Sequence, residues 1–278
     1  MVVPDQQRSD PRQRVGTLTE AVKDAVSLQI EGRLPEAEKI YAAVIAVDAC
    51  HFDSLHNLSL IRRRQGRLDE SLSLIRRALQ VDPNSWQALD SMGNVLLTLN
   101  RPVEAIACYE RAIALKPDAV EAYSNLGGAL VALNRPKEAI SRYQQALGYK
   151  PDYAEVQYFE SLARLTIGDF DDGWRKYEWR WLRKDATAFR RNFAQPLWLG
   201  SESLADKIIL LHADQGMGCT LQFVRYLPLV AQQAAGVVLE VQRPLVPLLR
   251  GLPGVAAICA RGDPFQHLIV IVRCSACL

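Results

Sequence analysis

The chain has 278 residues, of which 49% are hydrophobic and 23% charged, a composition typical of a globular protein with room for two domains. Its net charge of +2 gives no reason to expect nucleic acid or an anionic membrane as a partner. No apolar run reaches the roughly 20 residues of a transmembrane helix, so we expect no membrane span.

The N-terminal residues 1–16, MVVPDQQRSDPRQRVG, are polar and lack the apolar core of a secretory signal peptide. We predict a disordered lead-in here and interpret the protein as cytoplasmic. The six cysteines are scattered, unlike the dense pattern of a secreted disulfide scaffold. Cys274 and Cys277 form a single CxxC, and a zinc site would need two further ligands, so we predict no metal site.

Prolines recur at intervals of 34 residues, at Pro83, Pro117 and Pro151. Between them the segments SMGNVLLTLNRPVEAIACYERAIALKP and NLGGALVALNRPKEAISRYQQALGYKP repeat one another. The shared small and aromatic residues are Gly93 and Gly127, Ala105 and Ala139, Tyr109 and Tyr143, Ala112 and Ala146. A period of 34 with these residues in this order resembles the tetratricopeptide repeat (TPR) family, which implies one helix hairpin per repeat.

Each repeated residue has a predicted packing role. The glycines and alanines should let the paired helices approach closely, and the tyrosines should fill the space to the next repeat. The proline should end the second helix, because it has no N–H to donate. In the turns NRPVEA and NRPKEA, we predict asparagine at or near the helix cap and proline in the first turn.

Weaker copies in phase at 17–48, 51–82 and 153–182 extend the array to about five hairpins over residues 17–184. Each hairpin needs a neighbour to bury its apolar face, so the predicted fold is an all-α solenoid whose concave wall is lined by the first helices. We predict a protein or peptide ligand in this groove. Asn57, Ser91 and Asn125 share one phase of the repeat, followed by Phe159, and Asn94 in the same predicted helix as Ser91 completes the candidates.

The TPR arms of O-GlcNAc transferases, which this array resembles, imply that asparagines at such a phase contact the backbone of an extended peptide. Only Asn57 and Asn125 among the four positions in phase are asparagine. The alternative is that these are ordinary polar residues on a hydrated helix face.

Residues 173–198, GWRKYEWRWLRKDATAFRRNFAQPLW, are rich in tryptophan and arginine. Trp174, Tyr177 and Trp181 fall on one helix face. A basic, aromatic strip can bind nucleic acid, and a salt-sensitive RNA affinity depending on Arg190 and Arg191 would reveal it. We favour packing against neighbouring elements, predict no nucleic-acid partner, and place a linker at 185–203.

After Pro196 the pattern changes to short apolar strands and helices. Strands are predicted at 207–213, 236–242 and 254–262, with a helix over 219–234 and a short helix over 243–252. This β-loop-α-β-α-β order predicts a partial doubly wound, Rossmann-like α/β segment over residues 204–264. The loop DQGMG leads from strand to helix, a place where backbone N–H groups can hold an anion.

The text from PLWLGSESLADKIILLHADQGMG to GVAAICARGD looks like the opening of the GT-B glycosyltransferase domain that follows TPR arrays in bacterial proteins, similar to heptosyltransferases and O-GlcNAc transferases. The resemblance implies sugar transfer from a nucleotide-sugar donor to a protein or glycan acceptor. It would place six residues near the acceptor loop: His212, Gly216, Gly218, Cys219, Gln222 and Arg225.

Two departures from this family predict a non-catalytic fragment without a cofactor, for which we assign no catalytic residue. Cys219 stands where the family has an aspartate that serves as base, and a thiol is a poor substitute for a positioned carboxylate. The donor-binding second domain is also missing. Because the family likeness stops after Pro264, we interpret residues 265–278 as an aberrant tail left by a frameshift that truncated the domain. The alternative is an active transferase that binds a nucleotide sugar.

Overall fold

The computed structural model describes residues 11–184, 198, 200, 202–213, 216–263 and 271–274. The chain forms two compact units, Met1–Lys184 and Asp185–Leu278.

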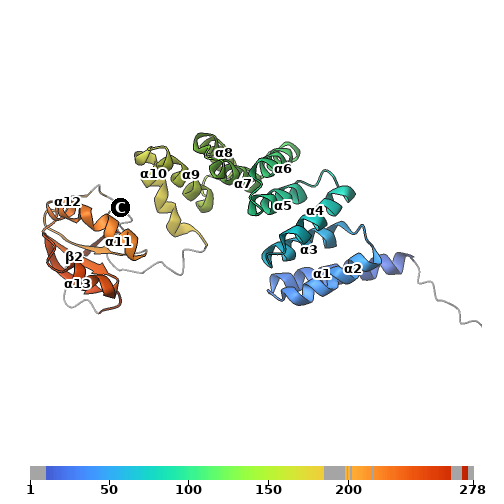
Figure 1. Cartoon of the computed structure of the whole chain (residues 1–278), viewed down its shortest axis with the longest axis horizontal. Coiled ribbons are helices and arrows are strands. Elements are labelled where there is room, and N and C mark those ends of the chain that lie inside the picture. Colours follow the sequence, from blue (N-terminus) through green and yellow to red (C-terminus); the bar gives the residue numbers. More distant parts are fainter. Residues whose placement is uncertain are drawn as a thin grey trace, which may run out of the picture. The chain divides into compact units, whose positions relative to one another are not determined.

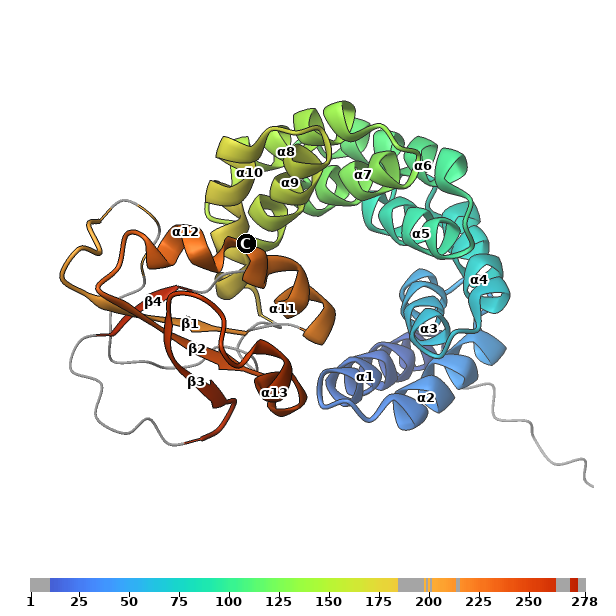
Figure 2. The same ribbon diagram turned by 60° about the vertical axis from the view of Figure 1, so that its left-hand side comes forward.

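The first unit is a series of antiparallel helix pairs (Figure 1). Its described part contains α1 (Pro11–Ile30), α2 (Leu34–Val47), α3 (Phe52–Arg64), α4 (Leu68–Val81), α5 (Trp86–Thr98), α6 (Pro102–Leu115), α7 (Val120–Ala132), α8 (Pro136–Tyr149), α9 (Ala154–Thr166), α10 (Phe170–Tyr177) and the 3₁₀ helix η1 (Glu178–Leu182). The predicted helical solenoid is confirmed. Figure 2 shows the first helix of each pair on the inner side of an arc and the second helix outside it.

The first helix starts earlier than predicted. The structure begins α1 at Pro11, whereas the sequence analysis assigned residues up to Gly16 to a disordered lead-in. Proline is well tolerated in the first turn of a helix, because the N–H that it lacks would have no partner there. Residues 1–10 lie outside the described part of the chain.

Glycine and tyrosine are packed directly against each other within a repeat. A methyl group at Gly93 would lie 2.5 Å from Cε1 and 2.7 Å from Cζ of Tyr109, and Gly127 meets Tyr143 in the same way. The tyrosines therefore fill space inside their own hairpin, which corrects the expectation that they reach the next repeat. Ring and glycine make a close helix contact that no larger side chain at the glycine would allow.

The turn inside each hairpin uses a left-handed residue followed by an ion pair. Gly32, Gly66, Asn100, Asn134 and Gly168 recur every 34 residues, and all have positive φ, between 56° and 83°. Glycine and asparagine tolerate this conformation best. The predicted asparagine cap is therefore wrong: Asn100 and Asn134 end the first helix, and the N-cap residues of α6 and α8 are arginines.

These arginines make a repeated contact with the first turn of the second helix. Arg33, Arg67, Arg101 and Arg135 each pair with the glutamate three residues later, at 2.6–2.7 Å. The prolines of NRP do lie at the start of α6 and α8, as predicted. The fifth hairpin has aspartates in this turn, and Arg164 of α9 pairs with Asp169 at 2.6 Å instead.

The last helix pair contains a fully buried carboxylate. Glu160 of α9 forms ion pairs with Arg164 Nη2 at 2.7 Å and with Lys176 Nζ of α10 at 3.0 Å. Two cations around one buried acid offset the cost of removing its charge from water, so this cluster fastens α10 to α9.

The second unit contains a parallel sheet of four described strands in the order β3-β2-β1-β4. The strands are β1 (Ile208–His212), β2 (Gly236–Val241), β3 (Val255–Ala260) and β4 (Ile271–Cys274). Ile208 aligns with Gly236 of β2 and with Ile271 of β4. The three predicted strands are present, and β4, with the sequence IVRC, falls within the stretch 265–278 interpreted as an aberrant tail.

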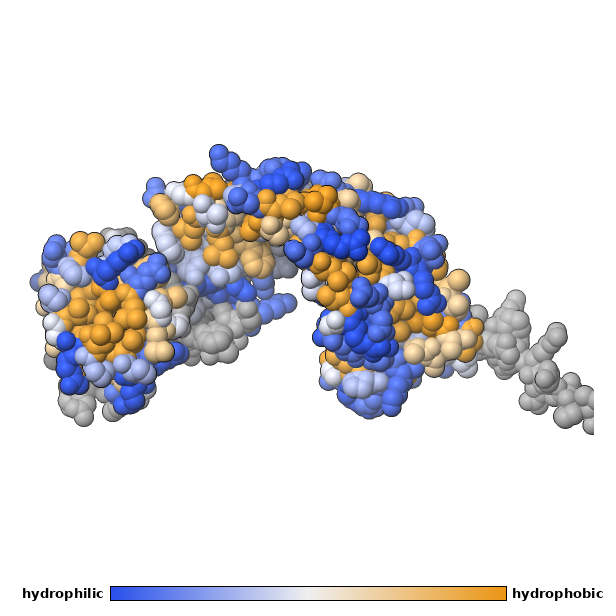
Figure 3. All heavy atoms as spheres, in the orientation of Figure 1, coloured by the Kyte–Doolittle hydropathy of each residue, from blue (hydrophilic) through white to orange (hydrophobic). Residues whose placement is uncertain are grey.

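One face of the sheet is covered by helical segments. Ile209, Leu211, Val237 and Leu239 form a buried cluster with residues of α12 (Leu227–Ala231), η4 (Arg243–Leu245) and α13 (Val246–Leu249). Apolar side chains also reach the surface of this unit, as the orange area over it in Figure 3 shows. Leu229 and Leu248 are among the exposed ones.

The predicted single helix over 219–234 is broken. It consists of α11 (Met217–Phe223), the 3₁₀ turn η3 (Val224–Tyr226) and α12. Pro228 lies in the first turn of α12, where a continuous α-helix would require its missing N–H as a donor to the preceding turn.

Candidate functional site

The inner wall of the helical array is crossed by hydrogen bonds between neighbouring repeats. His56 of α3 bonds through Nε2 to Ser91 Oγ of α5 at 2.9 Å. Asn125 of α7 donates through Nδ2 to Asp90 Oδ1 of α5, also at 2.9 Å. Both bonds join residues 35 positions apart, one more than the repeat. Equivalent positions are therefore joined twice in succession, first between α3 and α5 and then between α5 and α7. The two hydrogen bonds fix how these three inner helices are aligned.

Asp90 is the centre of this network. Its second carboxylate oxygen accepts from Asn94 Nδ2 at 3.0 Å, and Asn94 Oδ1 accepts from the Tyr109 hydroxyl at 3.1 Å. Burial raises the pKa of Asp90, while the hydrogen bonds from Asn125 and Asn94 act in the opposite direction. Tyr109 thus connects the inner wall to the glycine contact in the core of the hairpin.

His56 is held as a neutral ring. Burial lowers its pKa, against a smaller opposing effect of the Asp53 charge. The Nε2 of a neutral imidazole either donates the hydrogen bond to Ser91 or accepts it, and the tautomer decides which group donates.

The structure separates the predicted groove residues into two kinds. Ser91 is only 8% exposed and is bonded to His56, and both ends of the Asn94 amide are engaged. Asn57 is half-buried, and its side chain makes no hydrogen bond to any described residue. Asn125 uses one amide hydrogen for Asp90, which leaves its carbonyl oxygen as an acceptor. Asn57 and Asn125 thus remain available to a ligand.

The character of the wall changes along the array. Phe159 of α9 occupies the phase held by Asn125 in α7, and it is 37% exposed. Leu162, one turn further along α9, is exposed too. Sequence reasoning named Asn57, Ser91, Asn94 and Asn125 but missed His56 and Asp90, although they also lie 34 residues apart.

The aromatic residues after α9 pack within the first unit. The rings of Tyr158 and Tyr177 are 5.6 Å apart, and Trp174 meets Tyr177 edge-on at 5.5 Å. The guanidinium of Arg180 lies 4.4 Å over Tyr177, and that of Arg183 lies 4.4 Å over Tyr158. These contacts agree with the packing interpretation of this stretch. Arg190 and Arg191, named for the nucleic-acid alternative, lie outside the described residues.

The acceptor-loop candidates of the second unit lie at the end of β1, in α11 and at its N-cap, and in η3. His212 is buried at the end of β1, aligned with the buried Glu240 of β2. Gln222 and Arg225 are exposed, and Arg225 donates to the Tyr226 hydroxyl at 2.9 Å. Cys219 is half-buried in α11, where Thr220 donates to Gln242 Oε1 at 3.0 Å.

The two glycines of the loop have open space around them. A Cβ atom added at Gly216 or Gly218 would meet no atom within 4 Å. Packing within the described part of the chain therefore does not require glycine at either position. Among the described residues, no group of three or more His, Cys, Asp or Glu side chains is arranged to hold a metal ion.

The helix pairs, their 34-residue period and the inner wall define a TPR solenoid, and two family models match it. The model described as "TPR repeat" matches residues 93–134, and the one described as "Tetratricopeptide repeat" matches residues 25–88 and 126–188. The chain is a tetratricopeptide repeat protein. The matched segments end at residue 188, so the glycosyltransferase likeness of residues 204–264 stays a prediction.

Solved structures share the solenoid fold. A crystal structure of MamA is 20% identical over 65% of this chain and 98% of that chain, with a TM-score of 0.52. The structure from the functional characterization of Pseudomonas aeruginosa PilF is 16% identical over 60% of this chain and 76% of that chain, with a TM-score of 0.56. At these identities the likeness is one of fold. No curated protein matches the chain. None of the described helices has the length and apolar character needed to cross a membrane.

Proposed function

We propose that the first unit is a peptide-binding module that holds an extended segment of a partner protein along its inner wall. The observation that carries this proposal is the Asn57 amide, which lies on the wall without a partner among the described residues, at the phase where Asn125 recurs. An amide offers a donor and an acceptor together, which is what the backbone of an extended peptide needs.

The cross-repeat hydrogen bonds support binding by keeping the wall rigid. Asp90, Asn94 and Tyr109 hold Asn125 in one orientation, so little side-chain freedom remains to be lost when a ligand binds. The apolar side chains of Phe159 and Leu162 would then contact an apolar residue of the peptide near the C-terminal end of the array.

A peptide library displayed on phage and panned on the full chain would test this proposal. Affinities of the enriched peptides are then measured by fluorescence polarisation for the wild type and for Asn57→Ala, Asn125→Ala and Phe159→Asn. The matched control is Asn84→Ala, which removes an exposed asparagine from the turn between α4 and α5.

Weaker binding by about tenfold for Asn57→Ala, with Asn84→Ala unchanged, is the expected result. Asn57→Ala breaks no hydrogen bond among the described residues, so its effect separates ligand contact from folding. Equal affinities for all variants, or no enriched peptide, would contradict the proposal.

A second candidate function concerns the second unit, as the opening part of a GT-B glycosyltransferase domain that is not catalytic by itself. The parallel order β3-β2-β1-β4 supports it, because doubly wound nucleotide-binding domains have this order around their first strand. Incubation with radiolabelled UDP- and ADP-sugars should show no saturable turnover. Turnover that saturates with donor would instead favour an active transferase.

A further inference from the structure

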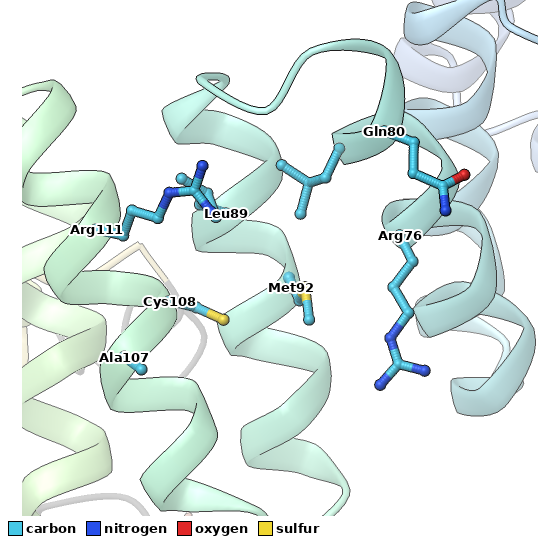
Figure 4. Close-up of a pocket in the computed structure, with 8 residues that line it drawn as sticks. Arg76, Gln80, Leu89, Met92, Ala107, Cys108 and Arg111 are labelled. Atoms are coloured by element: carbon cyan, nitrogen blue, oxygen red, sulfur yellow. The ribbon is translucent and has the colours of Figure 1, made fainter.

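A groove of about 460 Å³ lies on the first unit between α4 and α6, which are second helices of successive repeats. Its apolar lining comes from Leu79 of α4, Leu89 and Met92 of α5, and Cys108 of α6. Arg76 and Arg111 extend from the helices on opposite sides, with Met92, Leu89 and Cys108 between them (Figure 4). None of the described inner-wall contacts uses these residues.

Two lining residues of the groove are smaller than their counterparts in a neighbouring repeat. Cys108 stands where the preceding repeat has Leu74 and the following repeat has Arg142. Leu89 stands where α7 has Tyr123, whose ring is stacked on Tyr149 at a centroid distance of 6.2 Å. The small side chain of Cys108 therefore leaves space at this repeat boundary that Leu74 or Arg142 would occupy at the same phase.

The charge around the groove is positive. Arg111 donates through Nη2 to the carbonyl oxygen of Pro83 at 2.7 Å, which holds its guanidinium in place. Arg76 makes no hydrogen bond or ion pair with any described residue, although its charge contributes to lowering the pKa of Glu104, whose partner is Arg101. The groove lining contains no acidic side chain.

We propose that this groove is a second binding site, for a peptide segment that inserts an apolar side chain over Leu89 and Met92 and places a neighbouring carboxylate against Arg76. An apolar floor between two guanidinium groups is complementary to such a segment in both polarity and charge. The site is separate from the inner wall, so the two proposals stand independently.

The probe for this site is the fluorescein-labelled peptide acetyl-EELLEE-amide. The peptides acetyl-KKLLKK-amide and acetyl-EESSEE-amide serve as controls for charge and apolar character. Binding to the full chain is followed by fluorescence polarisation. Saturable binding is expected for the first peptide and not for the other two.

Two variants replace a groove residue by the residue found at the same phase of another repeat. Cys108→Leu fills the groove with the residue of the preceding repeat, and Arg76→Glu introduces the residue found at Glu110. Each should raise the Kd at least about tenfold, the expected effect of losing one apolar or charged anchor. The control Lys137→Glu makes the same charge change at an exposed position of α8 and should leave the Kd unchanged.

The thiol itself gives an independent readout. Iodoacetamide modification is measured by mass spectrometry for Cys108 and, as an internal reference, for the exposed Cys50. The probe should slow modification of Cys108 and leave that of Cys50 unchanged. No binding of the probe at about 1 mM, equal binding by Cys108→Leu and Arg76→Glu, or loss of binding only in Asn57→Ala would each overturn the proposal.

Discussion

The neighbouring glycines of α7 provide a sharp test of the packing argument. Gly127→Ala would place a methyl group 2.6 Å from Cζ and 2.8 Å from Cδ1 of Tyr143, whereas Gly128→Ala would meet no atom within 4 Å. Carbon atoms normally approach to about 3.5–4.0 Å, so the Tyr143 ring must move by about 1 Å to accept the first methyl. Such overpacking costs about 1–3 kcal/mol.

Both substitutions also gain helix propensity, by about 1 kcal/mol for alanine over glycine in a helix interior. Gly128→Ala should therefore raise the free energy of unfolding by about 1 kcal/mol. Gly127→Ala combines the same gain with the clash, so the two variants should differ by about 1–3 kcal/mol, with Gly127→Ala the less stable. Both substitutions lie in the interior of the same helix, α7, so the gain in helix propensity cancels when the two variants are compared.

Urea unfolding followed by circular dichroism at 222 nm measures this difference. The slope of the transition must be compared as well, because a repeat array can unfold in parts. Equal midpoints for Gly127→Ala and Gly128→Ala would refute the reasoning that the glycine–tyrosine contact sets the spacing of the paired helices.

Three further predictions concern single residues of the first unit. Gly168→Ala should lower the free energy of unfolding by about 1 kcal/mol in urea titrations, because alanine is strained at a φ of +83°; an unchanged midpoint would contradict this. His56→Gln should reduce the loss of Tm between pH 7.5 and pH 5, because burial lowers the folded-state pKa and the unfolded chain takes up the proton more readily below about pH 6.5. Parallel profiles of Tm against pH for wild type and variant would show that His56 does not contribute to the loss of stability at low pH. Glu160→Ala should cost about 3 kcal/mol, since Arg164 and Lys176 lose their shared buried partner; a loss below about 1 kcal/mol would mean that solvent replaces it.

The repeat could be predicted because the two central repeats carry residues whose packing and turn roles few other residue types can fill. Only glycine fits beneath the rings of Tyr109 and Tyr143, and a proline follows the second helix at three boundaries, at Pro83, Pro117 and Pro151. The sequence therefore specifies the number, order and pairing of the helices over the first unit.

The role of Asn100 and Asn134 was predicted wrongly because asparagine serves two purposes near helix ends. It can cap the following helix, or it can adopt the left-handed conformation that ends the preceding one. The same phase of the other repeats is occupied by Gly32, Gly66 and Gly168. Glycine is typical of a left-handed position after a helix, so it indicates the second role.

The inner-wall network lay beyond pattern reading because its bonds join residues 35 apart. A search at the repeat period aligns His56 with Asp90 and Ser91 with Asn125, but it does not pair one repeat with the next. That pairing depends on how far each hairpin is shifted against its neighbour, which is a property of the packed helices. The groove at Cys108 was missed for a similar reason, since a hollow depends on the sizes of several side chains together.

The central claim is that the ligand binds along the inner wall. Hydrogen exchange of the full chain, with and without a library-enriched peptide, tests it most directly. The account predicts slower exchange in the first helices, at residues 52–64, 86–98 and 120–132, and little change in the second helices of the same repeats. Protection confined to residues 68–81 and 102–115 would place that peptide on the outer side of the array and contradict the central claim.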